Sequence, residues 1–453
     1  MQDEYLKFLP DQFQRWLNGR RIEEVECILS DLAGVSRGKA MPSNKFSRQE
    51  QMFMPLSIFY QTISGDYVDM QIRDQWTEHD MVLIPDFSTA VCSPWSGDIT
   101  VQVIHDAKDL AGKPIDLVPR NVLKKVVSLY NDKGWEPLVA PEIEFYLTKP
   151  NLDPNLPIEP TMGRTGRRVA SRQAYSMMAV DEYGPVIDDI YDFAEAQGFD
   201  IDTIMQEGGA GQIEINLVHG DPVKLADQVF YFKRLIREAA LRQNCFATFM
   251  AKPMQDEPGS AMHIHQSVRD IKSRKNIFSG EDGQPTSYFY NFLGGQQHFL
   301  PKAISLMAPY VNSYRRYMAI GSAPINLEWG RDNRTTGLRV PLSSPDAIRI
   351  ENRVVGMDSN PYLAIAASLA CGFLGMKQQL EPRAEVKGEA YSLPRALPRG
   401  LLEGLELFDD APELERVLGK NFCKVYKSVK MYEAEAFLEV ISPWEREHLL
   451  LNV

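Results

Sequence analysis

The segment Pro141-Glu142-Ile143-Glu144-Phe145-Tyr146-Leu147 places two carboxylates, two positions apart, inside an apolar run. In a β-strand alternate side chains share a face, so Glu142 and Glu144 point the same way while Ile143 and Phe145 point into the core. Two like charges side by side in a buried strand are costly unless cations neutralise them. The segment therefore predicts a strand that contributes a carboxylate pair to a cation-binding site.

The same spacing recurs in His263-Ile264-His265 and in Glu351-Asn352-Arg353, and two further carboxylates, Glu207 and Glu214, flank a Gly-rich turn. Each motif alone has an ordinary explanation. Two histidines can be hydrogen-bonded in a half-buried strand, and a Glu and an Arg can form a plain salt bridge. Four such pairs together indicate one divalent-metal and phosphate site, assembled from strands that are far apart in the sequence.

Composition restricts the class of protein. A chain of 453 residues exceeds one ordinary core, so about two domains are expected. The net charge of −12 argues against a nucleic-acid partner. Five scattered cysteines without a CxxC pair are typical of reduced thiols, and the first residues show no export signal. The longest uncharged apolar run, residues 362–376, is shorter than the roughly 20 residues of a spanning helix and predicts a buried helix. We expect a cytoplasmic protein that does not bind membranes.

The pattern along the chain changes near residue 112. Residues 1–112 contain short extended pieces, and Gly34 and Gly38 predict turns around residues 36–42. Beyond that point, helical periodicity at residues 121–133, 182–197 and 221–244 alternates with the motif-bearing segments. Residues 269–286 predict an exposed loop, and the tail from Pro412 onward predicts helices. We therefore predict two domains, 1–112 and 113–453.

Taken together, these motifs resemble the glutamine synthetase family over nearly the whole chain. The segments that carry the resemblance are Gly38–Pro42, Glu142–Phe145, Gly211–Glu214, Lys252–Met254, Gly259–His265, Asn312–Arg316, Asp332–Arg334 and Asn360–Leu363. Within the family, Asn-Ser-Tyr-Arg-Arg at 312–316 and Trp-Gly-x-x-Asn-Arg-Thr at 329–335 resemble the branch that joins glutamate to amines, the γ-glutamylputrescine synthetases.

The resemblance implies an α+β fold, with a small N-terminal β-grasp domain at 1–112 and a larger catalytic domain with an antiparallel sheet at 113–453. It also implies a homo-oligomer, usually a dodecamer of two stacked hexamers. In such rings the active site lies between the small domain of one subunit and the large domain of its neighbour. The implied cofactors are two or more Mg²⁺ or Mn²⁺ ions per site, with ATP as a substrate.

Residue by residue, the resemblance assigns a role to each motif position. Carboxylates with one imidazole suit Mg²⁺ or Mn²⁺, whereas an all-sulfur or multi-His set would suit zinc. The first metal would be held by Glu144, Glu207 and Glu214, and the second by Glu142, His263 and Glu351. The nucleotide positions are His265, Ser267 and Arg349, and the arginines at the transferred phosphate are Arg334 and Arg339. The glutamate clamp is Gly259, Arg316 and Arg353.

The sequence departs from ammonia-using relatives at the amine site. In those relatives a carboxylate lies six residues after the Arg that matches Arg316, and this position is Ser322 here. A second ammonium-site carboxylate aligns with Thr62, although Asp66 lies only four residues further on. Phe59, Tyr60 and Trp329 could line an apolar pocket instead. An ammonium site without its counter-charges predicts a larger amine substrate.

We therefore predict an ATP-dependent, ADP-forming ligase that joins the γ-carboxylate of glutamate to an organic amine through γ-glutamyl phosphate. The amine is a polyamine or a monoamine, with broad use that includes monoamines favoured, and the product is a γ-glutamylamide, as in polyamine catabolism. The alternatives are an ammonia-using glutamine synthetase and a non-catalytic structural member of the fold. The partners expected are glutamate, ATP, the amine and further copies of the chain.

Overall fold

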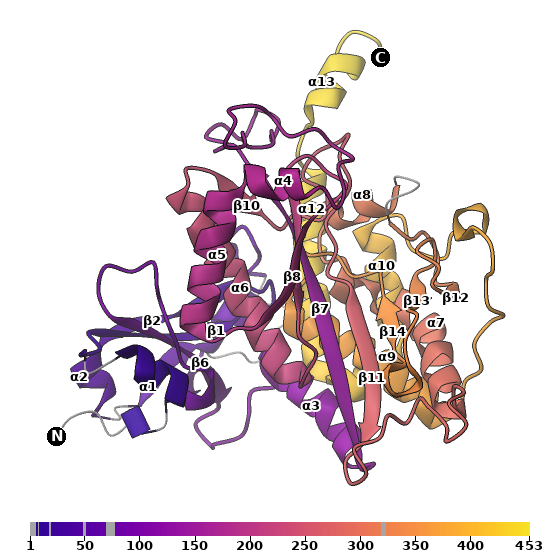
Figure 1. The fold of residues 1–453 in the computed structure, drawn as a ribbon, viewed down its shortest axis with the longest axis horizontal. Coiled ribbons are helices and arrows are strands. Elements are labelled where there is room, and N and C mark those ends of the chain that lie inside the picture. The colour runs from indigo at the N-terminus through magenta and orange to yellow at the C-terminus, as the bar shows by residue number, and fades with distance from the viewer. Residues whose placement is uncertain (1–5, 8, 18–19, 49–50, 69–77, 319–322) are drawn as a thin grey trace.

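The computed structural model describes residues 6–7, 9–17, 20–48, 51–68, 78–318 and 323–453, and its described strands form two sheets (Figure 1). The first sheet has the order β2-β1-β6-β4-β3, with β5 also paired to β6. β1 and β6 are parallel, and the other pairs are antiparallel. Its strands are β1 (Glu24–Ser30), β2 (Ser36–Pro42), β3 (Met52–Pro55), β4 (Asp80–Pro85), β5 (Val91–Cys92) and β6 (Thr100–Lys108).

The second sheet has the order β12-β13-β14-β11-β7-β9-β8, with β10 also paired to β7. Its pairs are antiparallel apart from β12 with β13. The strands are β7 (Trp135–Thr148), β8 (Ile201–Gln206), β9 (Gln212–Leu217), β10 (Phe246–Thr248), β11 (Ile264–Asp270), β12 (Trp329–Arg331), β13 (Leu338–Val340) and β14 (Ile350–Asn352). The segregation of helices from two mainly antiparallel sheets is the α+β architecture predicted.

A helical layer supports the second sheet (Figure 1). α3 and α6 contact β7, and α9 packs against α3, α6 and α7. The longer helices are α3 (Pro119–Asn131), α5 (Gly184–Gln197), α6 (Pro222–Arg242), α7 (Ser287–Met307), α9 (Pro361–Gln378), α10 (Leu401–Asp409) and α12 (Lys420–Leu438). The shorter ones are α1 (Asp11–Leu17), α2 (Ser43–Phe46), α4 (Met177–Glu182), α8 (Val311–Arg315), α11 (Pro412–Leu418) and α13 (Pro443–Leu449). The 3₁₀ turns are η2 (Leu56–Tyr60), η4 (Phe87–Thr89), η5 (Arg316–Met318), η6 (Pro345–Ala347) and η7 (Ala390–Ser392).

α9 is the buried helix expected from the apolar run at 362–376. Asn360 caps it, because its side-chain oxygen accepts from the amides of Tyr362 and Leu363, and Pro361 occupies the first turn. Every residue from Pro361 to Met376 is buried. Among the described residues, no helix combines the length and apolar character needed to cross a bilayer.

The structure corrects one prediction in the first domain. Residues 36–42, predicted to form turns, are strand β2, and Gly38 lies opposite Ile28 of β1. A Cβ at position 38 would overlap the carbonyl oxygen of Cys27, so this glycine serves close approach between strands. The turn itself falls at Gly34, whose φ is 82°.

Arg120, at the start of α3, connects the first sheet to the helical layer. Its guanidinium donates to Asp227 on α6, to Asp106 on β6 and to Asp86 just after β4, over distances of 2.7–2.9 Å. The arginine is 4% exposed. We propose that the domain boundary lies in the turn-rich stretch between β6 and α3, so that this cluster holds the small sheet against the helical layer.

Candidate active site

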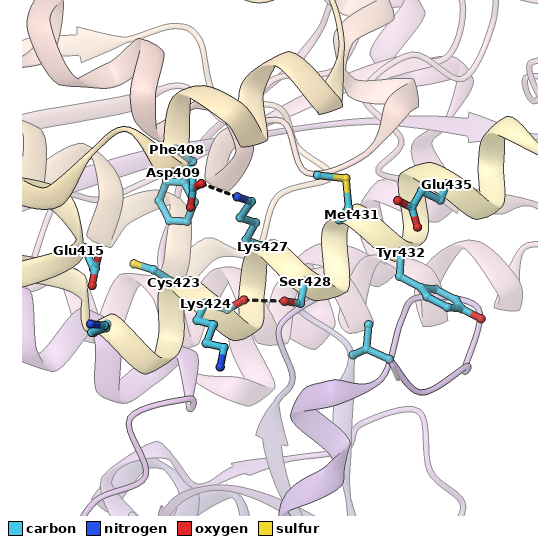
Figure 2. A pocket seen from close by; sticks show the side chains of 12 residues that line it. Phe408, Asp409, Glu415, Cys423, Lys424, Lys427, Ser428, Met431, Tyr432 and Glu435 are labelled. Carbon is cyan, nitrogen blue, oxygen red and sulfur yellow. Dashed lines mark hydrogen bonds and ion pairs between the residues drawn. The ribbon is translucent and has the colours of Figure 1, made fainter. Parts of the chain in front are cut away.

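A cavity of about 1020 Å³ lies over one face of the second sheet. Most residues predicted from the sequence line it, although they come from segments spread over more than 200 positions. These lining residues are Glu142, Glu144, Glu207, Glu214, Gly259, His263, His265, Ser267, Arg334, Arg339, Arg349, Glu351 and Arg353. A second cavity of about 620 Å³, between α12 and Val68, contains none of them (Figure 2).

The strand register explains why the carboxylates meet. Glu142 and Glu144 line the cavity, whereas Ile143 and Phe145 are fully buried, as strand alternation predicts. Glu144 lies directly opposite Glu214 on β9. On the other side of β7, the Glu142 amide donates to the carbonyl of His263, and His265 lies opposite Glu351 of β14. Neighbouring strands thus present acidic and imidazole groups at one level of the sheet.

The two histidines converge on one carboxylate. Nδ1 of His263 lies 2.6 Å from Oε2 of Glu142, and Nε2 of His265 lies 2.9 Å from Oε1 of the same residue. Nδ1 of His263 is also 3.8 Å from a carboxylate oxygen of Glu144 and 3.8 Å from one of Glu351. Glu142 is therefore the centre of the cluster.

Among the described residues, two groups have ligand atoms close enough to share a metal ion, within 4.8 Å of one another. They are Glu142 with His265 and Glu351, and Glu142 with Glu214 and His263. This grouping differs from the one that the family resemblance implied, because His265 joins a metal group and Glu144 and Glu207 lie outside both. The donor set is rich in carboxylate oxygen, which fits Mg²⁺ or Mn²⁺.

At several of these carboxyl groups, burial and neighbouring carboxylates outweigh the nearby positive charges. Burial, reinforced by Glu207, raises the pKa of Glu144 to about 8. Burial and the neighbouring Glu142, Glu144 and Glu207 raise the pKa of Glu214 to about 10. Burial also raises the pKa of Glu207. Because these groups resist ionising together, a divalent cation would supply the charge that the fold leaves out.

Arginines neutralise the opposite side of the cluster. Glu351 is 1% exposed, accepts from Nη1 of Arg339 at 2.7 Å and also accepts from Arg353. Burial opposes ionisation of Glu351, but the Arg353 guanidinium and the histidines hold its pKa below the usual value. Nη2 of Arg339 donates to Asp332 at 2.8 Å, and Arg334 lies in the preceding turn.

Arg316 occupies a different place from the one that the resemblance implied. It is 2% exposed and does not line the cavity. Its guanidinium donates to the backbone carbonyls of Arg353 and Val354, each at 2.7 Å. A Cβ at Gly259 would come within 2.7 Å of Cγ of Arg316, so the glycine allows the arginine stem to pass beneath the cavity. In this structure Arg316 supports the segment that carries Arg353.

The predicted amine-site residues lie elsewhere. Thr62 and Asp66 belong to the first domain and do not line the cavity, and Ser322 lies outside the described residues. Phe59, Tyr60 and Trp329, which the sequence suggested for an apolar pocket, are buried and do not line this cavity. The indole of Trp329 donates to the carbonyl of Arg383 at 2.7 Å, so its polar edge is also occupied within the core.

Sequence reasoning missed two amides that hold the carboxylates. Nε2 of Gln212 donates to Glu144 at 3.3 Å, and Nδ2 of Asn216 donates to Glu214 at 3.0 Å. The signal was present, because Gln212, Glu214 and Asn216 alternate along β9 and must share a face. The backbone amide of Ala261, which donates to Glu144 at 2.7 Å, has no comparable signal in the sequence.

The family model of the glutamine synthetase catalytic domain matches residues 116–449, a range that includes these motifs. The chain belongs to the glutamine synthetase family.

Two curated relatives are named for joining glutamate to amines. The γ-glutamylputrescine synthetase PuuA of Escherichia coli (strain K12) is 34% identical over 94% of this chain and 92% of its own length. The glutamate–isopropylamine ligase of a Pseudomonas species is 31% identical over 95% of each chain. Among solved structures, GmaS in complex with ADP has a TM-score of 0.82 and 25% identity, covering 97% of this chain and 99% of that one. The fold is therefore of the glutamine synthetase type.

Proposed function

We propose that the protein is an ATP-dependent, ADP-forming ligase that joins the γ-carboxylate of glutamate to an organic amine. The proposal rests on one observation: the same cavity is lined by carboxylates, imidazoles and the guanidinium groups of Arg334, Arg339 and Arg353. The relatives named for amine ligation support the choice of an amine over ammonia.

The side chains suit phosphoryl transfer to a carboxylate. A carboxylate must be converted to an acyl phosphate before an amine can displace its oxygen, and the transferring phosphoryl group spreads negative charge over its oxygens. Arg334 and Arg339, which line the cavity, would bind those oxygens, because a planar guanidinium matches phosphate geometry. Arg353 would hold a carboxylate of glutamate, and His265, Ser267 and Arg349 the nucleotide. Mg²⁺ or Mn²⁺, held by the Glu142-centred groups together with Glu144 and Glu207, would supply Lewis-acid neutralisation of the phosphate oxygens.

We propose broad amine use, including monoamines, in a cytoplasmic pathway of polyamine or amine breakdown. Thr62 is neutral and almost completely buried, so it offers no counter-charge to free ammonium. The five cysteines are free thiols, four of them buried, which suits a reducing compartment.

We further propose that the chain assembles into hexameric rings stacked as a dodecamer. Thr62 and Asp66 lie outside the cavity of their own chain, and a ring would bring the small domain of one subunit to the cavity of the next.

Coupled ADP release tests the reaction. With ATP, glutamate and Mg²⁺ or Mn²⁺ fixed, we expect turnover with putrescine, spermidine, an alkylamine or an arylalkylamine and little with ammonium. Comparable turnover with millimolar ammonium and no gain from any amine would identify an ordinary glutamine synthetase. The absence of Mn²⁺ and ATP-analogue binding would instead support a structural member of the fold.

A further inference from the structure

The 61–67 loop of the first domain has an internal chain of polar contacts. Oγ1 of Thr62 lies 2.9 Å from Oγ of Ser64, which donates to Asp66 at 2.8 Å. The amide of Asp66 donates back to Oγ1 of Thr62 at 3.0 Å, and Gly65 adopts a φ of 94°. These hydrogen bonds hold the loop in one conformation. The direction of the Asp66 carboxylate therefore depends on how the loop backbone runs.

A contact with the C-terminal region fixes that path. The amide of Ile63 donates to Oε1 of Glu433 on α12 at 2.7 Å, a hydrogen bond between residues 370 positions apart. The other oxygen of Glu433 accepts from the ammonium of Lys430 at 2.8 Å. The side chain of Lys430 is completely buried and that of Glu433 is 7% exposed. We call Lys430 and Glu433 the anchor pair.

The anchor pair determines the direction of a hydrogen bond to the loop, which apolar packing cannot do. A buried ion pair contributes little net stability, since desolvation offsets the attraction between the charges. With one oxygen held by Lys430, however, the second oxygen of Glu433 can take few positions, and it meets the amide of Ile63. The pair therefore determines where the middle of the loop lies.

The same pair also contacts the catalytic domain. The ammonium of Lys430 lies 4.1 Å from the ring centroid of Tyr310, at the N-terminus of α8. α8 leads directly into Arg316, which holds the carbonyls of Arg353 and Val354 beneath the cavity. One buried pair thus contacts both the 61–67 loop and Tyr310 of the larger domain.

We propose that Lys430 and Glu433 are positioning residues that fix the 61–67 loop and thereby determine which amines the enzyme accepts. This inference rests on the proposed function, in which Thr62 and Asp66 serve the amine site. The anchor pair touches no substrate, so it acts through the loop, and its removal alters the discrimination among amines more than the use of ATP or glutamate.

Matched variants separate this role from a general structural one. Lys430→Met/Glu433→Leu removes both charges at similar volume, so no buried charge is left unpaired. Lys430→Met/Glu433→Gln keeps a side-chain oxygen that can accept from Ile63. The control is Lys427→Met, also on α12, which breaks the 2.7 Å ion pair with Asp409 of α10 (Figure 2).

Amide hydrogen exchange on the full-length protein tests the anchoring without any activity. We expect exchange of the 61–67 amides to become about tenfold faster in the Leu double variant, because one hydrogen bond is lost. The Gln double variant should restore most of the protection, and the Lys427→Met control should match the wild type. Unchanged exchange in the Leu variant would overturn the anchoring.

Steady-state kinetics then test selectivity. In the Leu double variant we expect the ratio of kcat/KM for putrescine to that for ethylamine to change about tenfold, with the KM for ATP and glutamate within about twofold. Faster loop exchange with an unchanged ratio would overturn the selectivity role, as would an equal fall for all substrates. A wild-type enzyme with no amine-dependent ADP release would overturn the proposed function, and the exchange experiment would still decide the anchoring.

Discussion

Glu351 shows how one side chain can serve charge balance and chemistry together. It is 1% exposed and accepts from both Arg339 and Arg353. We expect Glu351→Ala to abolish phosphoryl transfer and to lower the free energy of unfolding by about 3–5 kcal/mol, because two guanidinium groups lose their buried partner. Urea unfolding and ADP release measure the two effects. Near-normal turnover at saturating Mg²⁺ would show that Glu351 is not a metal ligand.

Glu144 on β7 and Glu214 on β9 have pKa values shifted in the opposite direction from that of Glu351. The pKa values of Glu144 and Glu214, about 8 and about 10, lie above their value of about 4.5 in an unfolded chain, so the folded state holds more protons. The contribution of these two groups to the free energy of unfolding is complete below about pH 4.5. It is lost as the pH rises through their folded-state pKa values of about 8 and about 10. Without added divalent cation, the Tm should therefore fall between about pH 6.5 and pH 9, above the range in which the buried neutral His105 and His263 stabilise the fold as the pH rises.

Glu214→Gln should flatten that pH dependence, and Mg²⁺ or Mn²⁺ should raise the Tm of the wild type most at the alkaline end. Thermal scans across pH, with Glu281→Gln as the exposed control, measure this difference. A wild-type profile that rises with pH above about pH 6.5, or one that Glu214→Gln leaves untouched, would contradict the charge assignment.

The residue scale is where the sequence was most informative. The i, i+2 spacing in 142–144, 263–265 and 351–353 predicted side chains on one face, and all of these positions except Ile143, Ile264 and Asn352 line the cavity. The sequence could not specify which oxygen meets which nitrogen. These contacts depend on strand register and on side-chain rotamers. The register and rotamers of this structure bring His265 to Glu142 and direct Arg316 toward backbone carbonyls.

At the scale of elements, the long periodic helices were predicted well, and strand β2 was not. The helix predicted at 121–133 is α3, which begins two residues earlier because Pro119 suits the first turn. The helices predicted at 182–197 and 221–244 are α5 and α6. β2 was missed because its exposed, Gly-containing sequence lacks alternation, and only pairing with β1 makes it a strand.

The contact of α3 with the small sheet gives a prediction at this scale. Arg120 is buried among Asp86, Asp106 and Asp227, and Tyr362 also donates to Asp227. We expect Arg120→Met to cost about 3–5 kcal/mol in the free energy of unfolding, since it leaves the buried carboxylate of Asp227 without its cation. Lys124→Met, which removes only the more exposed partner of Asp106, is the control. Equal effects of the two changes in urea unfolding would contradict a special role for Arg120.

At the scale of the whole molecule, the cavity contains most of the residues predicted to bind the nucleotide, the metal ions and glutamate, whereas Thr62 and Asp66 do not line it. No periodicity in the sequence indicates how copies are arranged, because an interface depends on two surfaces meeting. The assembly therefore came only from the family resemblance. The separation of Thr62 and Asp66 from the cavity provides a physical way to examine it.

Subunit mixing tests that arrangement. Arg339→Ala disables the cavity, and Asp66→Lys places a cation where an amine would approach, so we expect each variant alone to turn over putrescine poorly. If the loop of one subunit serves the cavity of the next, random mixed rings should recover about a quarter of the wild-type sites, since each site needs one intact cavity and one intact neighbouring loop. ADP release after co-expression measures the recovery. Mixing Arg339→Ala with Glu144→Ala is the control, because both defects lie in the cavity and cannot complement each other. A loop that served its own chain would give no recovery in either mixture, and a fully active Asp66→Lys enzyme would remove the loop from the amine site.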